Sequence, residues 1–359
     1  MPELPEVETV ARDLRGLVVG ARITGAAVTW ARTLRNGDPE AFTREVSGRT
    51  IEGVGRRAKL VVVDLSDGLA LTIHLKMTGQ LFVVPAGGPV DPHVRLTIGL
   101  DDGREIRFRD IRKFGRVGLH GRDPGTGDLL DEPGGAVVFA GLGPEPLEDA
   151  FTVRAFRTRL RGRRGRLKPL LLDQGFVAGI GNIYADEALW RARLHPLRSA
   201  ATLRPPDERR LYGALRGILA EAIERRGSSI DDYTAPDGDG SMQERLDVYQ
   251  RTGAPCRRCG RAIRRIVVGA RATHFCSWCQ RLSRADRRGA ARILAGMSGG
   301  EGSPAARRGR RWTDLAVAGA LGALPDEVAR ATERERARAE RTRRAAATRR
   351  AAARAAAGG

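Results

Sequence analysis

The chain has 359 residues, of which 41% are hydrophobic, and its formal net charge is +20. This length and composition are sufficient for two or three domains with hydrophobic cores. The sequence contains no run of about 18 apolar residues, which argues against a membrane-spanning helix, and no apolar segment typical of a secretory signal peptide. The charge favours a polyanionic partner such as nucleic acid, although ribosomal, membrane-surface or arginine-biased proteins share this property.

The N-terminus offers a candidate nucleophile. Removal of Met1 would leave Pro2 with a free secondary amine, and Glu3 beside it can donate or accept a proton. A nucleophile next to an acid/base group is a basic unit of covalent catalysis. Taken alone, the segment favours a simpler alternative, in which Pro2 starts a helix and Glu3 and Glu6 interact with its positive end. Helical spacing of apolar residues predicts that helix over residues 6–19.

Short β-type runs follow from about residue 22 to residue 120, separated by Gly- and Asp-containing turns. The clearest runs are at 59–63, 69–73, 80–84 and 94–98. Regular short strands of this kind predict a β-sandwich. A Gly-, Pro- and Asp-rich stretch at 121–150 is typical of a linker.

Helical patterns return between residues 150 and 226, and residues 227–243 have the composition of a long loop. After residue 286 the composition reduces to Arg, Ala and Glu. We interpret this tail as a solvated or disordered helix-prone arm, which either binds DNA or has no specific role.

Lysine is rare in this arginine-rich chain. Among 63 basic residues only four are lysines, at Lys59, Lys76, Lys113 and Lys168. A lysine amine can lose its proton and take part in chemistry, which a guanidinium cannot do. Each lysine is therefore either a chemical group that arginine could not replace or a chance surface residue.

The four cysteines form one module, and their spacing predicts a zinc site. The ligands would be Cys256, Cys259, Cys276 and Cys279. Two Cys-x2-Cys pairs suit one tetrahedral, structural Zn²⁺ with no open coordination position. The residues between the pairs predict a β-hairpin with Arg271 near its tip, and arginines on this hairpin suit phosphate contacts.

Several motifs together resemble the formamidopyrimidine-DNA glycosylase family of bacterial base-excision repair enzymes, over about residues 1–282. They are Met1-Pro2-Glu3-Leu4-Pro5-Glu6, Arg56-Arg57-Ala58-Lys59, His74-Leu75-Lys76-Met77-Thr78-Gly79, Arg112-Lys113-Phe114-Gly115, Gly179-Ile180-Gly181-Asn182 and the cysteine module. The resemblance implies an α+β protein: a β-sandwich with a leading helix, then a helical helix–two-turn–helix domain with a β-hairpin zinc finger. The expected boundaries are 1–131 for the sandwich, 132–150 for the linker, 151–247 for the helical domain with a lesion-capping loop, 248–285 for the finger and 286–359 for the tail.

The resemblance also implies a reaction. Pro2 is similar to the nucleophile that expels the damaged base and forms a Schiff base with the sugar, and Glu3 to the proton donor to that sugar. Lys59 matches the proton donor for β-elimination and Arg271 the donor for δ-elimination. The implied activity is therefore that of a combined glycosylase and abasic-site lyase acting on oxidised purines in double-stranded damaged DNA.

Further residues match DNA contacts of the family. Met77, Arg112 and Phe114 match a wedge that fills the space left by a flipped base, although apolar residues such as Met77 and Phe114 are more often core residues. The residues that match the family's contacts to the DNA backbone are His93, Arg112, Arg163 and Asn182. The segment 228–243 matches a loop that closes over a flipped purine, but Gly240-Ser241-Met242-Gln243 lacks the aromatic residues often found there.

Two alternatives remain open at this stage. One is an endonuclease VIII-like enzyme for oxidised pyrimidines, which typically has Gly where this chain has Leu4. The other is a non-catalytic zinc-finger protein that binds damaged DNA. We expect a cytoplasmic, nucleoid-associated monomer that does not bind membranes.

Overall fold

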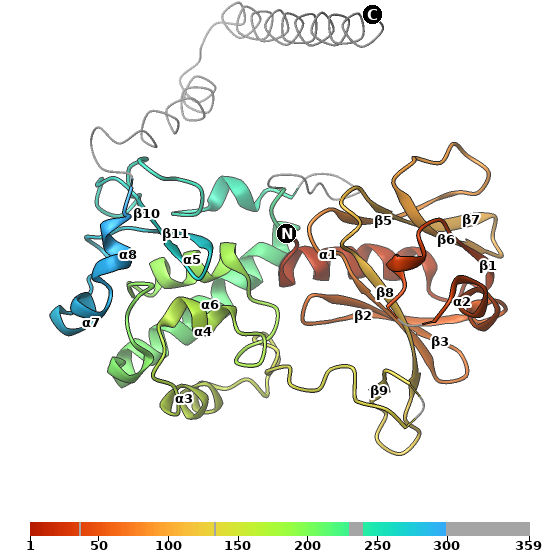
Figure 1. Cartoon of the computed structure of the whole chain (residues 1–359), viewed down its shortest axis with the longest axis horizontal. Helices are drawn as coiled ribbons and strands as arrows, with labels where there is room; N and C mark the ends of the chain where they lie inside the picture. The colour runs from red at the N-terminus through yellow and green to blue at the C-terminus, as the bar shows by residue number, and fades with distance from the viewer. Residues whose placement is uncertain (36, 133, 230–239, 299–359) are drawn as a thin grey trace, which may run out of the picture. The chain divides into compact units, whose positions relative to one another are not determined.

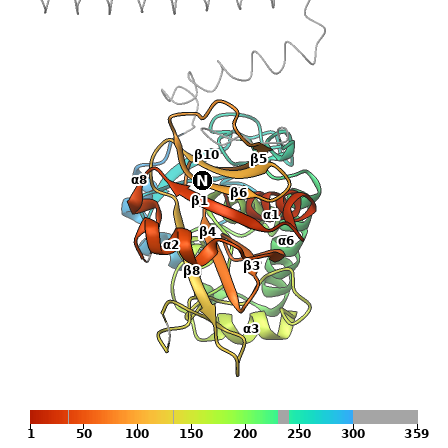
Figure 2. The same ribbon diagram turned by 90° about the vertical axis from the view of Figure 1, so that its right-hand side faces the viewer.

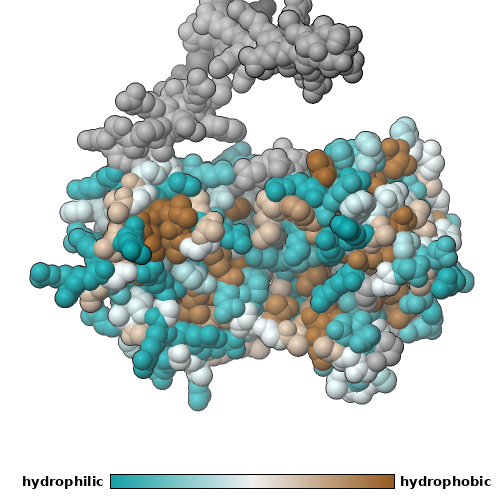
Figure 3. Space-filling view, viewed as in Figure 1, coloured by the Kyte–Doolittle hydropathy of each residue, from teal (hydrophilic) through white to brown (hydrophobic). Residues whose placement is uncertain are grey.

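The computed structural model describes residues 1–35, 37–132, 134–229 and 240–298, all of which belong to one compact unit, Met1–Gly300. A β-rich half and a helical half lie side by side, and the chain passes between them once through an extended segment (Figure 1). None of the helices in the described part of the chain is long and apolar enough to cross a membrane. Mostly hydrophilic residues cover the face shown in Figure 3.

The first half is a sandwich of two antiparallel sheets, as the strand pattern predicts. One sheet has the order β1 (Ile23–Val28), β6 (Val94–Leu100), β7 (Arg104–Asp110), β5 (Gly79–Pro85). The other has the order β2 (Ile51–Arg57), β3 (Leu60–Leu65), β4 (Leu69–His74), β8 (Arg116–Arg122), β9 (Leu129–Leu130). Inward-facing Val, Leu and Ile side chains of both sheets form one core, with the short helix α2 (Pro39–Val46) packed against β1.

Helix α1 (Leu4–Val18) belongs to both halves. Its residues from Val7 onward pack in the sandwich core, whereas Leu4 is buried in the core of the helical half. Figure 2 shows α1 beside α6 and between strands β5 and β3, and it contacts all three elements. The first turn of α1 therefore lies at the junction of the two halves.

The helical half consists of α3 (Val153–Arg161), α4 (Leu167–Leu172), α5 (Asn182–Arg191) and α6 (Pro205–Glu224). Helix α5 is buried at every residue from Ile183 to Trp190, which makes it the central helix of this half. Phe156 and Phe176, whose ring centroids lie 5.9 Å apart, belong to the same hydrophobic core as α5. Residues 134–150, which belong to the expected linker, contain no helix or strand in the described structure.

The hairpin predicted within the cysteine module is confirmed. Strands β10 (Arg264–Val268) and β11 (Arg271–Phe275) pair in antiparallel register, and Arg271 follows the turn at the tip.

The expected boundary at residue 286 differs from the structure. Residues 284–295 form two short helices, α7 (Arg284–Gly289) and α8 (Ala291–Ala295), and the chain then returns to β10, where Ser298 and Arg265 exchange two backbone hydrogen bonds of 2.8 Å. Ala290, Ile293 and Leu294 pack against Ile266, Val268 and Phe275 of the hairpin. The sequence did not predict this small apolar face, because the segment is rich in Arg and Ala and contains few large apolar residues. Residues 299–359, the remainder of the expected arm, lie outside the described residues.

A truncation tests this packing. A chain that ends at Leu282 is expected to unfold at a lower temperature than a chain that ends at Ser298, because the apolar face of the hairpin loses its cover. Thermal unfolding of the two zinc-loaded proteins measures the difference. Equal midpoints would show that residues 283–298 do not stabilise the finger.

Candidate functional site

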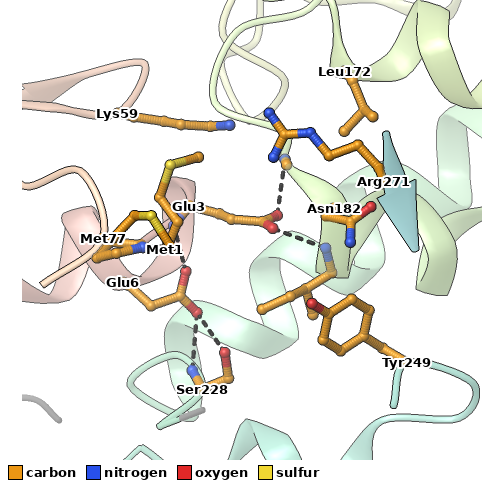
Figure 4. A pocket seen from close by; sticks show the side chains of 13 residues that line it. Met1, Glu3, Glu6, Lys59, Met77, Leu172, Asn182, Ser228, Tyr249 and Arg271 are labelled. Carbon is orange, nitrogen blue, oxygen red and sulfur yellow. Dashed lines mark hydrogen bonds between the residues drawn. The ribbon is translucent and has the colours of Figure 1, made fainter. Parts of the chain in front are cut away.

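A cavity of about 220 Å³ opens where the two halves meet. The first turn of α1, the β2–β3 turn, the start of α5 and the tip of the zinc-finger hairpin all contribute to it (Figure 4). Six of the predicted site residues line this cavity: Pro2, Glu3, Lys59, Met77, Asn182 and Arg271. Residues that are separated by up to 269 positions in the sequence thus share one pocket.

Glu3 is held by the start of helix α5. Its carboxylate accepts hydrogen bonds from the backbone N–H groups of Gly181 and Ile183, both at 2.8 Å, and from Tyr184 at 3.3 Å. The side chain is only 2% exposed. Burial raises the pKa of Glu3, while Lys59 and the backbone donors act in the opposite direction. A carboxyl group with a raised pKa is suited to give up a proton near neutral pH.

Two glycines allow this close approach. A Cβ on Gly181 would lie 2.3 Å from the Cδ atom of Glu3, and a Cβ on Gly179 would lie 2.6 Å from Leu4. Gly179 also has φ of +82°, a backbone conformation that favours glycine. Its carbonyl accepts the N–H of Leu4 at 3.0 Å. The Gly-Ile-Gly segment is therefore shaped around the first turn of α1.

Lys59 enters the cavity from the sandwich. Its ammonium donates to the carbonyl oxygen of Ile180 at 2.9 Å, and the residue is 8% exposed. Burial lowers the pKa of Lys59, Glu3 raises it and Arg271 lowers it. In Figure 4 the Lys59 and Arg271 side chains reach the cavity from opposite sides, near Glu3. A lysine with a lowered pKa can exchange a proton more readily than a solvated one.

A buried carboxylate from the linker fixes the turn that carries Lys59. Glu145 accepts hydrogen bonds from the Ala58 N–H at 2.6 Å and from the Arg57 guanidinium at 2.8 Å, and it pairs with Arg56 at 2.7 Å. Ala58 has φ of +53°, a conformation that this network holds in place.

Sequence reasoning missed the structural position of Glu6. Its carboxylate accepts from the Glu3 N–H at 2.8 Å, the Tyr184 hydroxyl at 2.5 Å and the Ser228 N–H at 2.9 Å. Glu6, Ser228 and Tyr249 also line the cavity. The repeated Pro-Glu pattern at the N-terminus was the available signal, but two of the three partners of Glu6, Tyr184 and Ser228, lie more than 170 positions away.

Met77 and Phe114 are not core residues, so the alternative interpretation of them is wrong. They are 37% and 47% exposed, in the β4–β5 and β7–β8 loops respectively. The Arg112 guanidinium lies 5.0 Å from the centre of the Phe114 ring.

The residues expected to contact the DNA backbone do not all lie at the cavity. Asn182 begins α5 and lines the cavity, and its buried side-chain oxygen has no hydrogen-bond partner in the described structure. His93 and Arg163 do not line the cavity formed by the described residues. His93 precedes β6, and Arg163 is an exposed residue after α3.

The expected lesion-capping loop is described only at its ends, because residues 230–239 lie outside the described residues. Ser228 and Ser241 form an isolated β-bridge. The Gln243 side chain accepts from the Ser229 N–H at 3.0 Å and donates to the Gly240 carbonyl at 2.5 Å. The non-aromatic Gly240–Gln243 segment thus closes the base of this loop.

The cysteine module fits one zinc ion. The four Sγ atoms of Cys256, Cys259, Cys276 and Cys279 all lie within 4.8 Å of one another. Tetrahedral zinc with Zn–S bonds of about 2.3 Å requires similar spacing. The Trp190 indole N–H lies 3.4 Å from the Cys256 sulfur and orients it. Four thiolates leave no position for a substrate, so the metal would stabilise the finger that carries Arg271.

Gly181→Ala tests the packing around Glu3. The added methyl group must displace the Glu3 carboxylate or the start of α5, so we expect a loss of about 1–3 kcal/mol in the free energy of unfolding. Urea unfolding measures the effect. Gly213→Ala in α6 is the control, because a Cβ there has no neighbour within 4 Å. A Gly181→Ala protein as stable as the wild type would contradict the packing.

Cys276→Ser tests the zinc site. We expect simultaneous loss of bound zinc and of DNA affinity, because the hairpin loses the metal that holds its ends. Metal analysis and fluorescence anisotropy with duplex DNA check this outcome, with Ser277→Ala as the neighbouring control. Unchanged affinity in the zinc-free protein would exclude a role of the finger in DNA binding.

Comparisons with known proteins agree with these features. Residues 1–117 match the formamidopyrimidine-DNA glycosylase N-terminal domain, residues 142–234 its H2TH domain, and residues 253–282 the zinc finger found in FPG and IleRS. Formamidopyrimidine-DNA glycosylases of Roseiflexus and Chloroflexus aggregans are 46% and 48% identical over 78% of this chain, covering 100% and 98% of the relatives.

Solved structures give the same result. Lactococcus lactis Fpg in complex with Fapy-dG-containing DNA has a TM-score of 0.71 and 38% identity, covering 78% of this chain and all of that chain. The MutM (Fpg) protein of Thermus thermophilus has a TM-score of 0.67 and 43% identity, and the match covers 78% of this chain and 98% of that chain. The chain belongs to the formamidopyrimidine-DNA glycosylase family.

Proposed function

We propose that this protein removes oxidised purines, such as 8-oxoguanine and formamidopyrimidines, from duplex DNA and cleaves the abasic site by β,δ-elimination. Family membership makes it a DNA glycosylase and abasic-site lyase. One observation supports the residue assignment most strongly: Pro2, Glu3, Lys59 and Arg271 line the same cavity.

In the proposed reaction the Pro2 amine, exposed by removal of Met1, attacks the anomeric carbon of the damaged nucleotide. The bond from sugar to base breaks, the base leaves with the electron pair, and the amine loses its proton. The C1′–O4′ bond of the sugar then breaks with its electron pair on the ring oxygen, and the C–N double bond of the iminium forms. Glu3, with its raised pKa, donates a proton to the sugar. The positive charges of Lys59 and Arg271 favour the unprotonated, nucleophilic form of the amine.

The iminium then withdraws electrons from the sugar, so that the phosphates on both sides can leave. We assign the proton transfer of β-elimination to Lys59 and that of δ-elimination to Arg271. Lys59 is suited to this step because burial lowers its pKa. Hydrolysis of the iminium regenerates Pro2.

DNA binding is assigned to residues around the cavity. Met77, Arg112 and Phe114 would enter the duplex where the damaged nucleotide flips out. His93, Arg163 and Asn182 would contact the phosphates, Asn182 by donating from its side-chain amide nitrogen. The zinc bound by the four cysteines keeps the finger folded. We further propose that the protein acts as a monomer in the cytoplasm, at the nucleoid.

The second candidate substrate class is oxidised pyrimidines. Leu4 favours purines, because the pyrimidine enzymes typically have Gly at the position of Leu4. Excision assays with 8-oxoguanine opposite C and thymine glycol opposite A distinguish the classes. Faster cleavage of the thymine glycol duplex would move the assignment to pyrimidines, and cleavage of neither would leave a DNA-binding protein.

Pro2→Gly, or protein that retains Met1, is expected to lose base excision and to keep its affinity for damaged duplex DNA. Both changes replace or block the amine without altering the phosphate contacts. Single-turnover excision and anisotropy binding measure the two properties. Pro39→Gly, at the first turn of α2, is a matched control with the same chemical change far from the cavity. Normal excision by the Met1-retaining protein would exclude the proline mechanism.

A further inference from the structure

Two loops carry the proposed wedge, and one buried carboxylate joins them. We define the wedge loops as residues 75–78, with Met77, and residues 111–115, with Arg112 and Phe114. Asp110 ends β7 and is 1% exposed. It accepts the Thr78 hydroxyl at 2.5 Å with one oxygen and the Gly115 N–H at 2.7 Å with the other. Asp110 thereby binds the end of each loop.

Thr78 completes the connection. Its hydroxyl donates to Asp110 and accepts the Arg112 N–H at 3.1 Å. Thr78 is 2% exposed. A buried hydroxyl with both roles filled orients its neighbours, because loss of either partner leaves a polar group unsatisfied. The backbone position of Arg112 therefore depends on a residue of the other loop.

The backbone of Asp110 extends the connection toward the expected phosphate contact. Its N–H donates to the His93 carbonyl at 2.9 Å, and its carbonyl accepts from the Arg95 guanidinium at 2.9 Å. The same guanidinium lies 3.2 Å from the His93 ring nitrogen. Asp110 thus links both wedge loops with the segment that carries His93.

The 111–115 loop has little freedom around these bonds. A Cβ on Gly115 would lie 2.4 Å from the Phe108 ring and 3.0 Å from Asp110. Lys113 has φ of +60°, and its ammonium lies 4.1 Å from the centre of the Trp30 ring, a favourable cation–π contact. Lys113 is thus held at the sandwich, while Phe114 remains 47% exposed.

We infer that Asp110 and Thr78 are positioning residues for base extrusion: they hold Met77, Arg112 and Phe114 as one preformed wedge. This inference rests on the proposed function, since it needs the wedge assignment. Among the described residues that line the cavity, neither Asp110 nor Thr78 is present. Their loss should therefore affect extrusion of the base from a duplex and leave the chemistry at Pro2 intact.

The test compares two substrates that differ in the need for a wedge. Asp110→Asn keeps the size of the side chain but cannot accept both hydrogen bonds, and Thr78→Val removes the hydroxyl. We expect single-turnover excision of 8-oxoguanine from duplex DNA to fall about 10-fold or more, since small misplacements reduce rates strongly. Cleavage of an abasic site in single-stranded DNA, which has no base to extrude and no opposite base, should stay close to wild type.

Two controls separate positioning from general destabilisation. Thr78→Ser restores the hydroxyl and should recover duplex excision. Asp101→Asn removes a carboxylate that accepts the Arg22 N–H at 3.0 Å at the other end of β7 and should leave both activities unchanged. Parallel losses on both substrates would overturn the inference, as would wild-type duplex excision by Asp110→Asn and Thr78→Val. Failure of the wild-type protein on both substrates would instead reject the proposed function.

Discussion

The contact between the first turn of α1 and the start of α5 determines the arrangement of the rest of the molecule. The Glu3 carboxylate accepts three backbone N–H groups of the Gly181–Tyr184 segment, and the Leu4 N–H donates to Gly179. A buried carboxylate without such donors would be strongly destabilising, and the N–H groups at a helix start need acceptors. Each half therefore satisfies the polar groups of the other. The same contact places Pro2 at the cavity.

Three of the four lysines make specific contacts in this arrangement. Lys59 donates to Ile180 inside the cavity, and Lys113 lies over Trp30. Lys168 is fully buried, and its ammonium donates hydrogen bonds to the Asp186 carboxylate at 2.6 Å and to the Ala272 carbonyl at 3.0 Å. Asp186 in turn accepts the His274 N–H at 2.8 Å. This buried pair anchors β11, and with it Arg271, to helices α4 and α5.

Local patterns in the sequence predicted most elements of the fold. Apolar runs identify β3 to β6, the cysteine spacing identifies the zinc site, and the residues between the cysteine pairs identify the hairpin, because these signals depend on nearby residues. The family motifs predicted that Pro2, Glu3, Lys59 and Arg271 share one catalytic site. The structure places all four at the same cavity. Their chemical roles stay predictions.

Long-range packing is what the sequence could not supply. Tyr184 and Ser228, which donate hydrogen bonds to Glu6, lie more than 170 residues away from it. The apolar face of residues 290–294 is short and surrounded by arginines. The exposure of Met77 and Phe114 also depends on tertiary structure, since an apolar residue alone favours the core. Asp110 had no distinguishing local pattern, although it joins three segments of the sandwich.

The central claim is that the amine of Pro2 forms the covalent intermediate, and trapping this intermediate tests it most directly. The protein would be incubated with an 8-oxoguanine duplex and borohydride, which reduces an iminium to a stable amine. Digestion and mass spectrometry then locate the DNA adduct. The account predicts an adduct on the peptide that begins at Pro2, in protein that has lost Met1. An adduct on the peptide of Lys59, the other buried amine at the cavity, would contradict it, and so would the absence of any adduct.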